Sequence, residues 1–165
     1  LPKFIASPAI LLPRRLRATQ NGHVASALRS DAWDGFPSSL HGLLAHIAER
    51  QIRHVVFLSG DEHLSCVTCA AIRSASGRCA TIHSVHSSAL YAPFPFANSV
   101  VADLAGDEEF GFAVAGNQYE CAVQTRFAAP GDGFCVVRVS DQAGVWTMRC
   151  EFDRSGATDV VERQL

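Results

Sequence analysis

The sequence contains no apolar run that approaches the roughly 20 residues needed to span a bilayer. Pro2, Pro8 and Pro13 interrupt the apolar amino-terminal segment, so no signal-peptide pattern is present, which favours a cytoplasmic location. An excess of charge of one sign is also lacking, because the formal net charge is only -2. The composition therefore gives no electrostatic reason to expect nucleic acid or an anionic membrane as a partner.

Methionine is nearly absent. The only one is Met148, and the chain begins with Leu1. Since a primary translation product begins with methionine, we expect this chain to be a processed or trimmed product or a piece of a longer protein.

The composition predicts one folded domain over residues 1–165. A hydrophobic content of 48% and a charged content of 18% exclude a disordered, highly charged chain. The six cysteines fall mostly in β-like segments, where a free thiol behaves as a small buried hydrophobe. Disulfides and zinc remain alternatives, although Cys66 and Cys69 have no second pair at zinc-ribbon spacing.

The segment His54–Ser65 combines a short apolar run with polar groups of catalytic type. Val55–Leu58 is apolar and ends abruptly, which favours a strand buried on both faces of a parallel sheet. Asp61 and His63 follow, where open α/β sheets place their chemistry. Carboxylate and imidazole are ligands for metal ions, and Gly60 would let the chain turn tightly. The alternative is a plain loop in which His63 is a surface histidine.

A helix is predicted to begin at Pro37, with Ser38 and Ser39 as possible caps. Its apolar residues follow the spacing of one helical face and are Leu40, Leu43, Leu44 and Ile47. This helix leads directly into the apolar strand, which is half of a βαβ crossover.

The segment Asp31–Pro37, which precedes this helix, predicts an ordered turn rather than a regular element. Within it, Asp34 is either a metal-proximal ligand or an acid favoured by the dipole at a helix amino terminus. Upstream, Arg14, Arg15 and Arg17 either meet a phosphate or form a salt-bridged loop.

Beyond His63 the pattern becomes that of antiparallel strands. Two β-like runs around residues 74–77 predict a hairpin. His83 and His86 would face opposite ways in the second run, and neither is a strong site candidate. Leu90–Phe96 predicts either a pocket-lining loop, with Tyr91 as a substrate-binding candidate, or a lid packed over the core.

The last third of the chain predicts a further set of strands. Residues 97–104 suggest a short helix, and residues 106–109 an acidic turn. From Tyr119 onward, period-two alternation between regularly spaced turns predicts an antiparallel meander.

Taken together, three parts of the sequence resemble the carboxyl-terminal half of a PhoD-type alkaline phosphatase, a branch of the calcineurin-like metallophosphoesterases. The match is close over about residues 30–66 and looser over residues 90–98 and the terminal strands. The three parts, which occur in matching order and spacing, are Asp31–Pro37, the helix with Leu43, Leu44 and Ile47, and Val55–Ser65.

The resemblance implies an α/β fold, α+β in this chain, that is part of a four-layer αββα sandwich. It implies a site for two divalent or trivalent metal ions, with iron, calcium, zinc and manganese as candidates. By this match His63 and Asp61 are metal ligands and catalytic residues, Asp34 is metal-proximal, and Trp33 forms a wall of the substrate site. Such a site hydrolyses phosphate esters with a metal-activated water.

The early motifs of the superfamily are absent. Gly-Asp occurs only at residues 60, 106 and 131, and none of these continues as the family pattern requires. The resemblance therefore implies that the chain is the carboxyl-terminal portion of a longer enzyme, and we expect the isolated chain to be inactive and prone to self-association. The alternative is a non-catalytic, β-rich interaction module that retains the scaffold without a metal site.

Overall fold

The computed structural model describes residues 1–14, 19–20, 23–24, 32–60, 62–91, 101–104 and 106–165. This part of the chain is mixed α+β, with mostly strands and one α-helix, α1 (Pro37–Glu49). A six-stranded sheet has the order β1 (Lys3–Ser7), β4 (Val55–Ser59), β6 (Cys79–His86), β5 (Leu64–Ser74), β8 (Asn117–Pro130) and β7 (Glu108–Val114). The smaller sheets are β11 (Ala157–Gln164), β10 (Val145–Arg154) and β9 (Gly133–Gln142), and the pair β2 (Thr19–Gln20) and β3 (His23–Val24).

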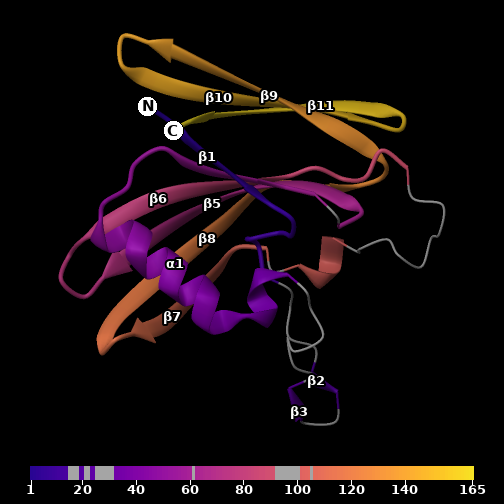
Figure 1. Ribbon diagram of the computed structural model, residues 1–165. Coiled ribbons are helices and arrows are strands. Elements are labelled where there is room, and N and C mark those ends of the chain that lie inside the picture. The colour runs from indigo at the N-terminus through magenta and orange to yellow at the C-terminus, as the bar shows by residue number, and fades with distance from the viewer. Residues whose placement is uncertain (15–18, 21–22, 25–31, 61, 92–100, 105) are drawn as a thin grey trace.

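Helix α1 covers one face of the six-stranded sheet, and the three-stranded sheet lies over the other (Figure 1). Strand β4 is parallel to both neighbours, β1 and β6. Its residues alternate between two cores, as period-two geometry requires. Val55 and Phe57 pack with α1, whereas Val56 packs with Met148 and Phe152 of the second sheet. The predicted strand buried on both faces is therefore confirmed.

The predicted helix is confirmed, and its apolar face lies in the core. Leu40, Leu44 and Ile47 are buried, and Leu43 packs against them. The predicted serine caps are wrong, because Ser38 and Ser39 already lie inside the first turn. Phe36 is the N-cap, and no side chain caps the helix. Proline at the first position lacks an N–H, so one of the unsatisfied donors is already missing there.

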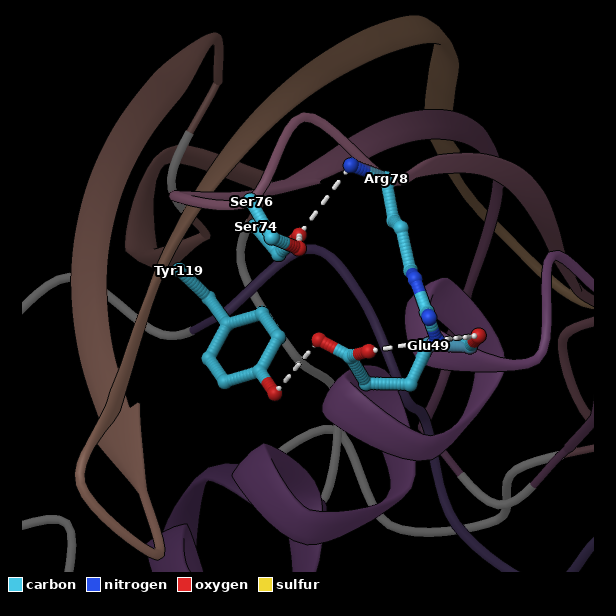
Figure 2. Close-up of polar contacts among 5 residues, drawn as sticks. All are labelled: Glu49, Ser74, Ser76, Arg78 and Tyr119. Atoms are coloured by element: carbon cyan, nitrogen blue, oxygen red, sulfur yellow. Dashed lines mark hydrogen bonds and ion pairs between the residues drawn. The ribbon is translucent and has the colours of Figure 1, made fainter.

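The carboxyl end of α1 is fixed to the sheet through the side chain of Glu49 (Figure 2). The Tyr119 hydroxyl donates to Glu49 Oε1 at 3.0 Å, and Arg78 donates from Nη1 to Oε2 at 2.9 Å. Arg78 also donates to the Glu49 carbonyl, while its own N–H donates to Ser74 Oγ. Helix α1 is thereby connected to β8 and to the turn between β5 and β6.

The β-rich part of the chain differs from a single meander. The hairpin of β5 and β6 is confirmed, with Gly77 at φ 85° in its turn. However, β8 belongs to the six-stranded sheet and only β9–β11 form a separate one. Strand β7 was not predicted, because its acidic first residues suggested a turn. It pairs with β8, and the turn between the two strands consists of Ala115 and Gly116, both with positive φ.

Two shorter predictions concern single-turn elements. Trp33–Gly35 forms the 3₁₀ helix η2, so the ordered turn before α1 is a short helix. Val101–Asp103 forms the 3₁₀ helix η4, while the rest of the predicted short helix lies outside the described residues. In the part of the chain that the structure describes, no helix has the length and apolarity to span a bilayer.

Candidate functional site

Three parallel strands, β1, β4 and β6, have their carboxyl ends side by side at one end of the large sheet. The register aligns Ser7 of β1 with Ser59 of β4, and Ser59 with His86 of β6. All three are therefore the last residues of their strands. In sheets of this kind, the carboxyl ends of parallel strands are the usual place for a ligand.

The segment after β4 must cross the end of β6, because β4 continues into β5 and β6 lies between these two strands. His86 lies beneath this crossing and is completely buried. Its Nε2 is 3.1 Å from the carbonyl oxygen of Glu62, and its Nδ1 is 2.9 Å from Ser59 Oγ. Since a carbonyl oxygen only accepts, Nε2 donates, and in a neutral imidazole Nδ1 then accepts from the Ser59 hydroxyl. His86 thus fixes the segment that carries the predicted ligands.

Trp33 lies at the end of β1, where its Nε1 donates to Ser7 Oγ at 2.9 Å. Its ring lines a cavity of about 260 Å³ together with Phe36, which is 58% exposed. The remaining lining residues are Pro8, Ala9 and Ser39. Trp33, which was predicted to form a wall of the substrate site, therefore lines a small, largely apolar cavity.

The remaining predicted site residues are Asp34, Asp61, His63 and Tyr91. Asp34 follows Trp33 in η2, and its Oδ1 is shielded from solvent. His63 is half-buried and directly precedes β5, at the same edge as the end of β6. Asp61 lies outside the described residues. Tyr91 is 74% exposed, so no closed pocket surrounds its ring.

The donors in the described residues are too few for a metal site of their own. No group of three or more His, Cys, Asp or Glu side chains there is arranged to hold a metal ion. A metal ion in a protein generally takes four or more ligands, mostly from the chain. His63 and Asp34 alone therefore do not form the site that the resemblance implies.

The two histidines of β6 face opposite ways, as predicted, since His83 lies in the row of Val56 and His86 in the row of Ser59. Neither was a strong site candidate in the sequence, and the contacts of His86 give it a structural role at the strand ends. Gly60 is not required by backbone conformation, because its φ is not positive and an added Cβ would lie 3.6 Å from the Ser87 carbonyl oxygen.

Arg14 forms a salt bridge with Glu108, which is one of the two alternatives predicted for it. Its Nη2 is 2.7 Å from Glu108 Oε2, and its guanidinium lies 3.6 Å from the centre of the Phe110 ring. The salt-bridged interpretation therefore holds for Arg14, whereas Arg15 and Arg17 lie outside the described residues.

The family model of the PhoD-like phosphatases matches residues 3–114. This range contains the three parallel strand ends, η2, α1 and the crossing segment. No curated protein and no solved structure matches the chain.

Proposed function

Since this chain belongs to the PhoD-like phosphatase family, we propose that it forms part of the active site of a metal-dependent enzyme that hydrolyses phosphate esters. The observation that supports the location is the crossing segment, which His86 holds over the end of β6. This segment carries His63 to the strand ends, where parallel sheets bind ligands.

In this proposal His63 and Asp61 are the metal ligands and catalytic residues of the chain, and Asp34 lies close to the metal. The ions would be iron, calcium, zinc or manganese. When bound, such ions polarise phosphoryl oxygens and make a bound water a nucleophile at neutral pH. Because the described donors are too few, other parts of a longer polypeptide would supply the remaining ligands.

The other residues of the edge hold and shape the site. His86 and Ser59 set the path of the segment that carries His63. Trp33, fixed by its bond to Ser7, would contact the alcohol part of the ester through the cavity that it shares with Phe36. Tyr91, exposed beyond the end of β6, would also contact the substrate.

The layers of the fold agree with a larger sandwich. The helix, the six-stranded sheet and the three-stranded sheet would be three layers of a four-layer αββα arrangement (Figure 1). In this proposal the chain is the carboxyl-terminal portion of the catalytic domain.

The test compares this chain with the polypeptide encoded by the complete reading frame. We expect the longer polypeptide to bind metal ions and hydrolyse p-nitrophenyl phosphate, and the isolated chain to be inactive. His63→Ala should abolish metal binding and turnover, whereas His46→Ala, at an exposed position of α1, should leave both unchanged.

Two results would contradict the proposal. Turnover by the isolated chain, abolished by His63→Ala, would show that no further ligands are needed. A complete polypeptide that neither binds metal nor hydrolyses phosphate esters would instead indicate a non-catalytic interaction module.

A further inference from the structure

A second and larger cavity, of about 750 Å³, lies at the opposite end of the parallel strands. Its walls come from both sheets and from the segment 51–54, which precedes β4. β6 contributes its first residues and β11 its last ones, so this cavity lies between the sheets and away from the strand-end site. Its volume is within the range of small-molecule sites.

The described residues that line this cavity include several with basic side chains and none with an acidic side chain. They include the side chains of Arg53, Arg126 and Arg163 together with His54 and His83. None of the described lining residues is Asp or Glu. A group of arginines in a concave site attracts anions.

Three buried nitrogen atoms that belong to lining residues of this cavity have no hydrogen-bond partner among the described residues. They are Nδ1 of His54, Nδ1 of His83 and Nε of Arg163. His83 is only 4% exposed, so water is largely excluded from its ring. Buried polar nitrogens without partners are rare in folded proteins, and several in one cavity indicate a missing partner.

The fold directs these side chains into the cavity. Arg163 pairs across β10–β11 with Met148, which is buried between the two sheets, so Arg163 points inward as well. Arg126 occupies the irregularity between β5 and β8, where the register shifts after Val67. A β-bulge of this kind redirects a side chain.

The nature of the walls favours an anion over a metal ion. Burial, and then the neighbouring Arg163, lower the pKa of His83, so its ring is neutral near pH 7. No group of three metal-ligating side chains occurs in the described residues, and the arginines would repel a cation. A guanidinium instead matches the oxygens of phosphate and carboxylate groups.

We propose that this cavity binds a small molecule carrying an oxyanion such as phosphate, which accepts hydrogen bonds from Arg163 and His83. This site is separate from the strand-end site and does not depend on the proposed phosphoesterase activity. The oxyanion would neutralise the arginines of both sheets.

The experiment is calorimetric titration of the metal-stripped chain with inorganic phosphate and with pyrophosphate. We expect saturable binding at one site, weakened at least about tenfold by Arg163→Gln. Arg138→Gln is the matched control, because Arg138 pairs with Arg149 on the outer face of the same sheet. His63→Ala should also bind normally, which separates this cavity from the strand ends.

Circular dichroism shows whether each variant folds. If Arg163→Gln does not fold, His83→Gln serves as the second variant. Absence of binding up to about 10 mM anion would overturn the proposal. Equal affinity of wild type, Arg163→Gln and His83→Gln would also overturn it, since the anion would then be bound elsewhere.

Discussion

The hydroxyl of Ser59 donates to Nδ1 of His86 at 2.9 Å and thereby joins the last residues of two parallel strands. The same imidazole donates from Nε2 to the carbonyl oxygen of Glu62. One buried ring therefore connects the end of β4, the end of β6 and the segment between β4 and β5. The position of His63, the next residue after Glu62, depends on this ring.

We expect Ser59→Ala to lower the free energy of unfolding by about 1–3 kcal/mol, because the buried Nδ1 of His86 loses its donor. Urea denaturation followed by circular dichroism measures this change. Ser140→Ala, at an exposed position of β9, is the control and should stay within about 0.5 kcal/mol of wild type. Equal stability of the two variants would show that the Ser59 hydroxyl contributes nothing to this edge.

Leu44→Ala tests the packing of α1 on the large sheet. Leu44 is completely buried, so its truncation leaves a cavity and should lower the free energy of unfolding by about 2–5 kcal/mol. Leu90→Ala removes the same atoms from a side chain that is 75% exposed and should change stability by less than about 0.5 kcal/mol. Similar urea midpoints for both variants would contradict the observed core.

Local periodicity predicted the elements that lead to the site. The spacing of Leu40, Leu44 and Ile47 was sufficient for α1, because each helical face has a fixed repeat. The apolar run Val55–Leu58 was sufficient for a strand, because both faces of β4 are covered. These interactions depend on neighbours within a few residues or on burial alone.

The order of the strands could not be predicted in this way. That β6 lies between β4 and β5 depends on pairings between distant residues, and the role of His86 follows from that order. Strand β7 was missed for a related reason, since Glu108 is paired with Arg14, which is 94 residues away. The cavity between the sheets likewise depends on distant residues, because it forms only where β11, which carries Arg163, lies near β6, which carries His83.

All six cysteines are free, and the prediction of buried thiols holds for Cys66, Cys121 and Cys150 but not for the exposed Cys79. Their exposure predicts their reactivity. Burial raises the pKa of the Cys66 and Cys121 thiols to about 12, so little thiolate is present at pH 8. In the native chain we expect the exposed Cys79 to react first with a thiol reagent, and Cys79→Ser to lose this rapid phase. Unfolding without reductant should release six reactive thiols; fewer would reveal a disulfide.

Self-association is expected through the edge strand β1. This strand is the last of its sheet among the described residues, and its Phe4 and Ile5 are 45% and 37% exposed. An unpaired edge with apolar side chains favours pairing with another chain. Sedimentation should show concentration-dependent oligomers that Ile5→Lys reduces and Val145→Lys, at a surface position of β10, does not. A stable monomer at all concentrations would refute this expectation.

Acid should destabilise the chain through His83. Its folded-state pKa is lowered by burial and by Arg163, whereas in the unfolded chain it takes up a proton near its ordinary value of about 6.5. The unfolded state therefore binds more protons, so stability is retained above about pH 6.5 and falls as the pH decreases toward the folded-state pKa.

We expect urea denaturation between about pH 8 and pH 5 to show this loss in a phosphate-free buffer, and His83→Gln to reduce its slope. The pKa of His41 is also lowered, by burial and by Arg14, so part of the slope should remain. His46→Gln, at an exposed position of α1, should leave the slope unchanged. Addition of phosphate should reduce the slope for wild type, because an anion beside His83 raises its pKa. An unchanged slope in His83→Gln would mean that this imidazole does not contribute to the acid sensitivity.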